Sequence, residues 1–465
     1  MPARDRIDFS PTPRRLRGAG GRSRGSVLVV SLLVAALIAL VLGGYLSLNL
    51  GTARLSQRTF NRGAAFHLAE AGLEEGLWSY NRRLAGNADA WNDWSVSGDA
   101  AWRRFDGFPL AAATTGTVKV YATPVAPDER ARPTLVALAS VQSPGVAPVT
   151  RLLEVSLRRR SFFGAGLVAR DSLAFRGANV SFDSWDSDPD QDPATPAVPY
   201  APPQSKDTGE IATGARLAAD LDLGQARIHG YLRTRNLSPS IRSPGFIGPF
   251  GTPAGEIDAS RIGHDYNDDF PVIPAPTDGT FIASFGPVLG TPGVATSWRA
   301  PALRLNGKQT LLILGDVTLV LTDVLDALAI TGSAAIIVPP GSSLTLYLAG
   351  DALISGQGLV NTNAAPAALQ FWSTADGARR QHIRLSGGGG LSAVVYAPEA
   401  DFSVTGNGEF FGSIIARNIV FGGNAAYHHD LALGRLARHA PFRASGWRTV
   451  DDPAARAALL PLVDR

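Results

Sequence analysis

The stretch Ser26–Leu50, SVLVVSLLVAALIALVLGGYLSLNL, decides how the chain is organised, because it is a long uncharged run near the N-terminus. As an α-helix it would rise about 37 Å, enough to cross a hydrocarbon core of roughly 30 Å. The apolar part of a secretory signal peptide is shorter, about 7–15 residues, and ends at a small-residue cleavage site. The run therefore predicts one transmembrane helix, residues 26–50, that stays in the mature protein.

The charges that flank this run orient it. Residues 1–25 contain seven arginines and two aspartates, a net charge of +5, whereas the rest of the chain has 36 basic and 38 acidic residues, a net charge of −2. Arginine is retained on the cytoplasmic side of a membrane. We therefore expect a cytoplasmic leader, residues 1–25, a single pass through a membrane, and a bulk that lies outside the cytoplasm. That bulk gives no compositional argument for binding nucleic acid.

The overall composition is that of a folded protein rich in turns. The chain has 465 residues, of which 45% are hydrophobic and 18% charged, with 50 glycines and 32 prolines. This length suggests two or three domains, and the glycine and proline content favours β-structure with many turns. The sequence contains no cysteine, which excludes disulfides, thiolate metal sites and cysteine nucleophiles.

The helical pattern continues beyond the apolar run, since no proline occurs from residue 52 to residue 84. A stripe of apolar residues recurs there at helical spacing: Phe66, Ala69, Leu73, Leu77, Tyr80 and Leu84. Residues 116–160 then contain three β-rich runs separated by proline and glycine. We therefore expect residues 51–160 to form an amphipathic helix packed on a small sheet.

Two segments, residues 24–48 and 65–80, resemble the N-terminal region of PilX-like type IV pilus-assembly proteins, within the wider group of pilins and pseudopilins. The most specific part is AEAGLE, residues 69–74, whose first four members are Ala69, Glu70, Ala71 and Gly72. The resemblance implies a pilin-like α/β module and cleavage by prepilin peptidase between Gly25 and Ser26. It also implies that other pilin-like subunits pack against the membrane helix, for which the candidate residues are Val30, Leu33, Leu37 and Leu40.

The sequence departs from the pilin pattern at two places. Pilins usually begin with Phe or Met after cleavage, whereas this chain would begin with Ser26, and Val30 occupies the place of the usual glutamate. Because a lone charge in lipid is costly, that glutamate is thought to pair with a neighbouring subunit's amine. Its absence indicates a minor, tip or initiating subunit. The alternative is an ordinary signal anchor that is never cleaved.

A short pattern recurs downstream, at residues 167–179, 347–358, 396–408 and 414–425. Each copy has an alternating apolar strand followed by a corner rich in glycine or asparagine, and Gly406-Asn407 and Gly423-Asn424 are 17 residues apart. Such repeats suggest the coils of a β-solenoid, with polar ladders that include Ser355, Ser403 and Thr405. We expect a solenoid over residues 161–433, an insertion rich in Pro, Asp and Gly at about 180–300, and a tail at 434–465.

Residues 307–433 resemble the β-helical domain that follows PilX-like N-termini in many envelope proteins. The residues that carry this resemblance are 392–433, SAVVYAPEADFSVTGNGEFFGSIIARNIVFGGNAAYHHDLAL. The activity of that domain is generally unassigned, so the resemblance implies a fold. Taken together, the predicted fold class is mixed: a long N-terminal transmembrane helix, a small α/β module and a predominantly β, solenoid-like C-terminal domain.

Three polar clusters are candidate metal sites, and one of them, residues 264–269 (HDYNDD), favours a polar loop over a metal site. Calcium prefers several oxygen ligands on one loop, and alternating aspartates supply them at Asp183, Asp186, Asp188, Asp190 and Asp192. The glycine and glutamate that complete an EF-hand are missing, so a solvated acidic turn is the favoured alternative. The run His428-His429-Asp430 favours a corner-packing role over zinc, because adjacent strand residues point to opposite faces.

The leading functional hypothesis is a non-catalytic minor-pilin-like protein without a cofactor, whose partners are the lipid bilayer, other pilin-like subunits and prepilin peptidase. A polysaccharide or other surface is a further candidate partner. The second hypothesis is a static membrane-anchored adhesin or scaffold that never enters a fibre. The third is a carbohydrate-active β-helix enzyme using Glu399, Asp401 or Glu409, although a fold alone does not establish an activity.

Overall fold

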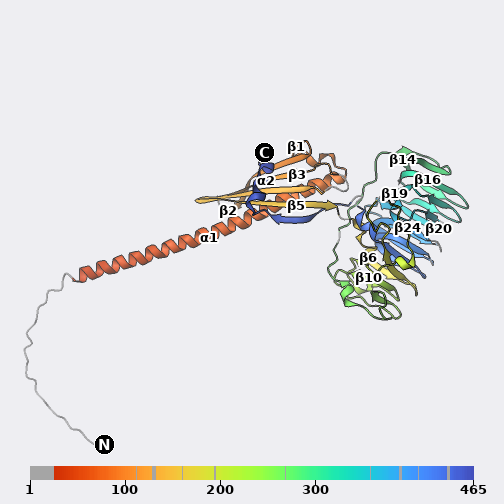
Figure 1. Cartoon of the computed structure of the whole chain (residues 1–465), viewed down its shortest axis with the longest axis horizontal. Coiled ribbons are helices and arrows are strands. Elements are labelled where there is room, and N and C mark those ends of the chain that lie inside the picture. The colour runs from red at the N-terminus through yellow and green to blue at the C-terminus, as the bar shows by residue number, and fades with distance from the viewer. Residues whose placement is uncertain are drawn as a thin grey trace, which may run out of the picture.

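The computed structural model describes residues 26–464 apart from 112, 128–131, 160, 193–194, 268, 357, 387–389, 407 and 437–439. Three parts follow one another in Figure 1: a projecting helix, an antiparallel sheet with a helix on each face, and a parallel β-solenoid. The expected fold class, a long apolar N-terminal helix followed by a predominantly β C-terminal domain, is confirmed.

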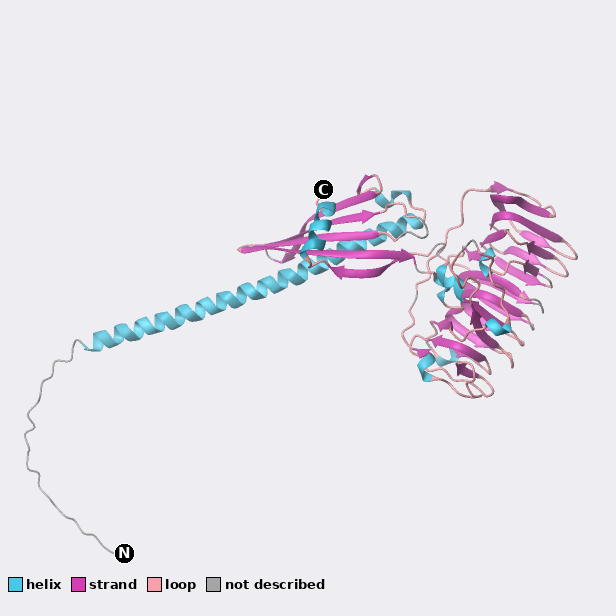
Figure 2. Ribbon diagram, viewed as in Figure 1, coloured by secondary structure: helices cyan, strands magenta, loops and turns pink. Residues whose placement is uncertain are grey.

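The N-terminal helix α1 (Ser26–Leu84) is continuous through 59 residues and has two different halves. Side chains of the first half are exposed, whereas the second half packs against the antiparallel sheet (Figure 2). The predicted stripe is confirmed as the packed face: Ala69, Leu73 and Tyr80 are buried, and Phe66, Leu77 and Leu84 are partly buried beside them.

The antiparallel sheet has the strand order β1-β2-β3-β4-β5-β27. Its strands are β1 (Ser95–Ser97), β2 (Ala100–Ala111), β3 (Thr114–Thr123), β4 (Thr134–Ser143), β5 (Val146–Arg159) and β27 (Phe442–Thr449). Side chains alternate between its two faces, so Leu135 and Ala137 face α1, whereas Val136 packs against α2 (Pro453–Val463).

Glycines let α1 lie unusually close to this sheet. A Cβ atom added to Gly72 would lie 2.8 Å from the Val118 Cγ2 atom, and one added to Gly76 would lie 2.5 Å from the Leu135 Cδ2 atom. Both distances are shorter than real Cβ contacts, so a side chain at either position would require Val118 or Leu135 to move. Within the AEAGLE segment, Ala69 and Gly72 therefore form the packed face. Its other face is open: Ala71 is exposed, and Glu70 lies 3.0 Å from the ring of His67.

A buried polar group closes the point where α1 leaves the sheet. Asn61 is fully buried, and its Oδ1 atom accepts hydrogen bonds from the Ser143 hydroxyl at 3.0 Å and from the Gln57 amide at 3.0 Å. The hydroxyls of Thr114 and Ser143 lie 2.9 Å apart in the same group. Buried polar groups need such partners. This group, Gln57, Asn61, Thr114 and Ser143, is here called the helix clasp, and it marks the boundary between the exposed first half of α1 and the half that packs on the sheet.

The C-terminal segment is part of the sheet, which corrects the expected tail at 434–465. Strand β27 pairs antiparallel with β5, and the Asn81 side chain of α1 accepts from the Phe442 backbone N–H at 2.8 Å. Phe442 is 1% exposed and packs beside Tyr80. The strand was missed because most of its side chains are exposed, so its sequence, FRASGWRT, shows no alternation. The solenoid is therefore inserted between two neighbouring strands of the sheet.

The solenoid consists of two stacks of coils joined end to end in one column. The first contains β6 (Leu167–Phe175), β7 (Ser181–Trp185), β8 (Gly209–Thr213), β9 (Leu221–Asp222), β10 (Arg227–Arg233), β11 (Phe246–Gly248) and β12 (Ile262–Gly263). The second contains β13 (Thr280–Phe281), β14 (Val288–Ala300), β15 (Leu303–Leu305), β16 (Thr310–Leu321), β17 (Asp326–Ile330), β18 (Ala335–Val338), β19 (Ser343–Leu348), β20 (Asp351–Ser355), β21 (Gly358–Asn361), β22 (Leu369–Ser373), β23 (Gln381–Ser386), β24 (Leu391–Thr405), β25 (Glu409–Phe421) and β26 (Ala426–Asp430). The two stacks meet where β6 and β7 of the first pair with β25 and β26 of the second.

The chain does not wind through these coils in a single direction. It enters at β6, winds outward through β8 and β10 to β12, and crosses to the far end of the domain. From β14 it winds back through β16, β19, β22 and β24, until β25 pairs in parallel with β6. The insertion expected at about 180–300 is therefore wrong for most of its length, because β7–β12 are coil strands. These strands are short and are separated by corners rich in Pro and Gly. Their sequence therefore shows no long alternation of apolar and polar residues.

The crossing is made by residues 264–267 and 269–279, here together called the return segment. It packs along the outer face of the sheet, where its Tyr266 and Ile273 cover Trp372 and Tyr396 in one buried cluster. The Tyr396 hydroxyl donates to the Pro271 carbonyl oxygen at 2.8 Å. Trp372 and Tyr396 point outward from the sheet, and the return segment buries them in a second hydrophobic core.

Glycine corners appear where the repeats predict them, and the predicted polar ladder is present in part, because Ser403 pairs with Arg384 and Val420 outside it. Gly423 has φ +84° and stacks directly on the backbone of Gly406, so no side chain fits at that corner. Paired positions Asp401 and Asn418 are 17 residues apart, the predicted length of one coil. Ser355, Ser386 and Thr405 occupy successive positions of one ladder.

The close approach of α1 to the sheet makes a prediction about stability. The substitution Gly72→Val should lower the free energy of unfolding by about 1–3 kcal/mol, because the new side chain must displace Val118 or Val120. Urea unfolding of the full chain in detergent micelles, followed by tryptophan fluorescence, measures the change.

The matched control is Gly63→Ala, because nothing lies within 4 Å of the added Cβ atom. Alanine favours a helix over glycine, so this variant should be as stable as the wild type or up to about 1 kcal/mol more stable. Equal stability of Gly72→Val and the wild type would contradict the close approach.

Candidate functional site

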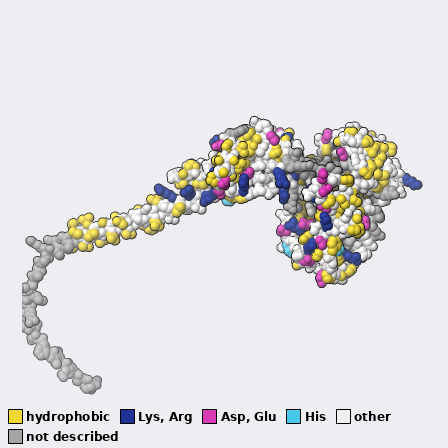
Figure 3. Space-filling view, in the orientation of Figure 1, with side chains coloured by type: hydrophobic (Ala, Val, Ile, Leu, Met, Phe, Trp, Pro, Cys, Tyr) yellow, Lys and Arg dark blue, Asp and Glu magenta, His cyan; other side chains and the backbone are white. Residues whose placement is uncertain are grey.

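The first candidate site is the free half of α1, which presents apolar side chains on every side. The predicted packing residues Val30, Leu33, Leu37 and Leu40 are 58%, 64%, 67% and 79% exposed. Figure 3 shows hydrophobic side chains along this projecting part, and its length and composition suffice to span a membrane. Of the predicted cleavage residues, Ser26 begins α1, and Gly25 lies outside the described residues.

The chemistry of the helix surface changes after residue 53. No charged residue occurs between residues 26 and 53, and then Arg54, Arg58 and Arg62 follow at intervals of four, all exposed. This spacing places the three arginines on one side of the helix. Arginine is stable at the polar boundary of a membrane but not in its interior. The apolar surface therefore ends within two turns of the helix clasp.

The second candidate is the acidic loop that follows β7. Asp183 accepts from the Tyr200 hydroxyl at 2.7 Å and lies 2.5 Å from the Nδ1 atom of His428. Asp186 and Asp188 both pair with Arg435, at 3.1 and 3.3 Å.

The remaining two predicted aspartates belong to a turn. The Asp190 carboxylate accepts from the Asp192 backbone N–H at 3.3 Å and from the Thr195 hydroxyl at 3.0 Å, and these bonds lower the pKa of Asp190. Among the described residues, no three His, Asp or Glu side chains are grouped as metal ligands. The proposed calcium ligands therefore act in this structure as partners of arginine, histidine and backbone groups.

The His428-His429-Asp430 run ties β26 to its neighbours. The two histidines point to opposite sides of the strand: His428 lies between the rings of Tyr200 and Phe411, and the His429 Nε2 atom is 3.3 Å from the Phe163 carbonyl oxygen. Asp430 accepts from the Ala432 N–H and from the Ser187 N–H and hydroxyl. This geometry favours the corner-packing interpretation over a chelating pair.

Burial shifts the titration of two of these groups in opposite directions. His429 is 1% exposed, and the loss of hydration lowers its pKa from 6.5 to about 4. Burial also raises the pKa of the Asp430 carboxyl, although its hydrogen bonds act against this effect. At neutral pH, His429 is therefore an uncharged member of the core.

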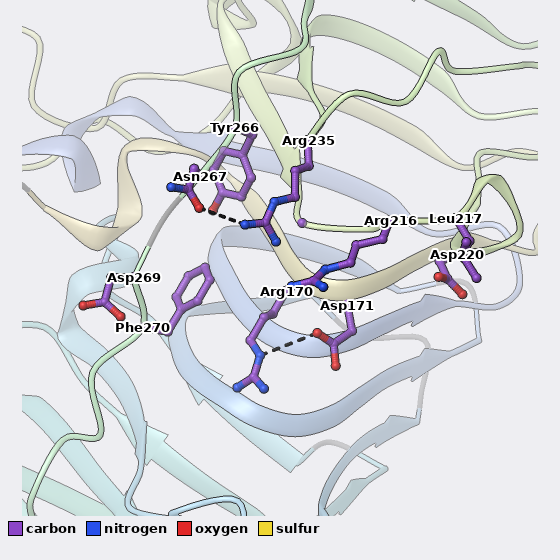
Figure 4. A pocket seen from close by; sticks show the side chains of 11 residues that line it. Arg170, Asp171, Arg216, Leu217, Asp220, Arg235, Tyr266, Asn267, Asp269 and Phe270 are labelled. Carbon is purple, nitrogen blue, oxygen red and sulfur yellow. Dashed lines mark hydrogen bonds and ion pairs between the residues drawn. The ribbon is translucent and has the colours of Figure 1, made fainter.

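The third candidate is a cleft at one corner of the solenoid, with a volume of about 750 Å³ (Figure 4). Its walls come from β6, from the loop after β8, from the turn after β10 and from the return segment. The polar lining consists of Arg170, Asp171, Arg216, Asp220, Arg235, Asn267 and Asp269, and Tyr266, Phe270 and Leu217 supply apolar surface.

The arginines of this cleft have unequal partners. Arg170 forms ion pairs with Glu399 and, at 3.5 Å, with Asp171, which also binds Arg417 at 2.7 Å. Arg235 donates to the amide oxygen of Asn267 at 3.3 Å, and Arg216 forms no ion pair with any described residue. The cleft thus combines a closed ion-pair network on one wall with available guanidinium donors on the other.

Of the three carboxylates considered for carbohydrate chemistry, Glu399 belongs to this network, whereas Glu409 lines a different hollow. Glu399 pairs with Arg170 and, at 3.9 Å, with Arg417. Asp401 accepts from the Asn418 amide at 2.7 Å and lies 3.6 Å from Arg380. Glu409 begins β25 and is exposed. Catalysis by these residues stays untested.

The sequence did not predict the cleft, although it carried one signal for it. An Ala-Arg pair ends aligned strand segments in LVAR (167–170) and IIAR (414–417), and Ala169 pairs directly with Ala416. Side chains at equivalent positions of successive coils stack in a column. Arg216 and Arg235 join this corner only because β8 and β10 stack in turn on β6, which no local pattern indicates.

Comparison with known proteins identifies one family region. Residues 308–436 match the model of the family described as Domain of unknown function (DUF7305), which lies in the second stack of coils. No curated protein matches the chain. The resemblance of the N-terminal region to PilX-like proteins stays a prediction.

Two solved structures are similar. One is the DUF3494 domain of an ice-binding protein from Shewanella frigidimarina, at 14% identity and TM-score 0.25, covering 57% of this chain and 94% of that chain. The other is the competence-associated pilin ComZ from Thermus thermophilus, at 14% identity and TM-score 0.24, covering 83% of this chain and 96% of that chain.

The buried His429 makes a prediction about pH. The unfolded chain protonates this residue below about pH 6.5 and the folded chain only below about 4, so the free energy of unfolding should fall as the pH drops between these values. The contribution of His429 approaches about 3 kcal/mol. Comparing urea unfolding of the wild type and His429→Gln at several pH values isolates it.

In this comparison the variant should show a shallower pH dependence than the wild type. The control is Val324→Ala on the solenoid surface, which is 58% exposed, removes no titratable group and should leave the pH dependence unchanged. Identical pH profiles of His429→Gln and the wild type would contradict an uncharged, buried His429.

Proposed function

We propose that this chain is a non-catalytic, pilin-like subunit, anchored in a bacterial inner membrane, that holds a β-solenoid outside the cytoplasm for contacts with other subunits or surfaces. One observation carries the proposal: α1 is a single helix whose second half packs into a folded module and whose first half exposes apolar side chains all round. Such a surface needs lipid or other apolar helices to cover it.

The charge distribution supports the orientation. The seven arginines before Ser26 favour a cytoplasmic N-terminus, and the remaining chain has a net charge of −2. Arg54, Arg58 and Arg62 would then lie at the outer boundary of the bilayer. With this orientation, the antiparallel module and the inserted solenoid face the periplasm or the cell exterior.

The free half of α1 also has features suited to packing against other helices. Gly43, Gly44 and Gly51 have open space beside them, with nothing within 4 Å of an added Cβ atom. Small residues let helices in membranes approach closely. The proposed partners are therefore pilin-like subunits that pack on this surface beside Val30, Leu33, Leu37 and Leu40.

The natural absence of cysteine gives a direct test of topology. A cysteine in Val324→Cys, on the solenoid at 58% exposure, should react with a membrane-impermeant maleimide in intact spheroplasts. Val338→Cys is the matched control, because Val338 is fully buried and should react only after unfolding. Reaction of Val324→Cys only after lysis would place the solenoid in the cytoplasm and overturn the proposal.

A second test distinguishes a fibre subunit from a static scaffold. Mass spectrometry of the membrane-extracted protein should find Ser26 as the N-terminus, and shearing of cells should release the protein with surface fibres. Gly25→Leu should block cleavage and leave the protein with the cell body. An intact leader in the wild type, with no release by shearing, would favour the anchored scaffold.

A further inference from the structure

We propose that the corner cleft of the solenoid binds a carboxylate-bearing oligosaccharide, such as a short stretch of a uronic-acid polymer. This inference deepens the proposed function, because it names the surface contact that a displayed solenoid would make. It depends on that function only for the access of the ligand from outside the cytoplasm.

The size and position of the cleft suit a short saccharide. Its volume of about 750 Å³ is within the range of roughly 300–1,000 Å³ that is typical of small-ligand sites. It follows the corner of the first stack, where successive strands are about 4.8 Å apart. A corner that repeats along the solenoid axis offers similar groups at regular intervals, which matches a linear polymer better than a compact ligand.

Two arginines provide donors for an acidic group. In Figure 4, Arg216 and Arg235 reach into the cleft from different walls, and neither forms an ion pair with a described residue. Each guanidinium carries five N–H donors in a planar fork, a geometry that fits a carboxylate with two parallel hydrogen bonds. Both side chains are exposed, so a ligand can reach them without displacing a buried ion pair.

The other lining groups suit a sugar ring better than a bare anion. Asp220 and Asp269 lie on opposite sides of the cleft and form no ion pair with described residues, so their oxygens can accept from hydroxyl groups. Phe270, which is half-buried between them, provides an apolar surface for the C–H face of a ring. Because both acidic and basic groups line the cleft, a ligand that carries both hydroxyls and a carboxylate is the best complement.

The same charges argue against nucleic acid. A polyphosphate ligand requires a run of uncompensated basic residues, whereas Asp171, Asp220 and Asp269 line this cleft and the chain after residue 25 is net negative. The network of Arg170, Asp171, Glu399 and Arg417 is already paired and forms a fixed wall beside the site.

The test is a binding measurement by calorimetry on the full chain in detergent micelles, with trigalacturonate as the probe and maltotriose as the neutral comparison. The wild type should bind trigalacturonate saturably at up to millimolar concentration, more weakly as ionic strength rises. The double variant Arg216→Gln/Arg235→Gln should bind at least about tenfold more weakly, because two charge-assisted contacts are lost. Arg384→Gln, at an exposed arginine that does not line the cleft, should change the affinity less than about twofold.

Three outcomes would overturn the inference: no saturable binding of trigalacturonate, equal binding by the double variant, or equal binding of maltotriose. Competition by inorganic phosphate at the same concentration would show a general anion site and would also overturn it. Unchanged urea unfolding of the double variant shows that a loss of binding is not a loss of fold. Because this assay uses purified protein, its failure is independent of the membrane topology tested above.

Discussion

The burial of one stripe of α1 under the antiparallel sheet is the interaction on which the rest of the molecule depends. Glycines at positions 72 and 76 let α1 lie close to β3 and β4. The sheet therefore packs directly on the helix. The helix clasp around Asn61 then sets where packing ends. The part of α1 that precedes the clasp is exposed on all sides, and over residues 27–53, which carry no charge, such a surface needs apolar surroundings.

The path of the chain through the solenoid explains how this large domain can be inserted into the small antiparallel sheet. Because β25 returns to pair with β6, the chain enters and leaves the solenoid side by side, and the Ser161 hydroxyl near the start donates to the Leu433 carbonyl oxygen near the end. Neighbouring ends allow a domain to be inserted without breaking its host. The host strands are β5 and β27, which remain paired, and Asn81 of α1 holds the start of β27.

Features set by local periodicity could be predicted from the sequence, and features set by long-range register could not. The stripe from Phe66 to Leu84 and the corner at Gly423 follow from spacing and backbone freedom. Strand β27 could not be predicted, because an exposed edge strand needs no apolar alternation. The cleft was missed for a related reason: Arg170, Arg216 and Arg235 belong to different coils, and only the register of β6, β8 and β10 brings them together.

The central claim is that the free half of α1 lies in lipid while the folded parts remain in water. A nitroxide on the single cysteine of Leu37→Cys, with the full chain in nanodiscs, tests this most directly by electron paramagnetic resonance. The account predicts that the nitroxide is relaxed by dissolved oxygen, which concentrates in lipid, and hardly at all by a water-soluble nickel chelate. Strong relaxation by the chelate, as for a label on the solenoid surface, would contradict it.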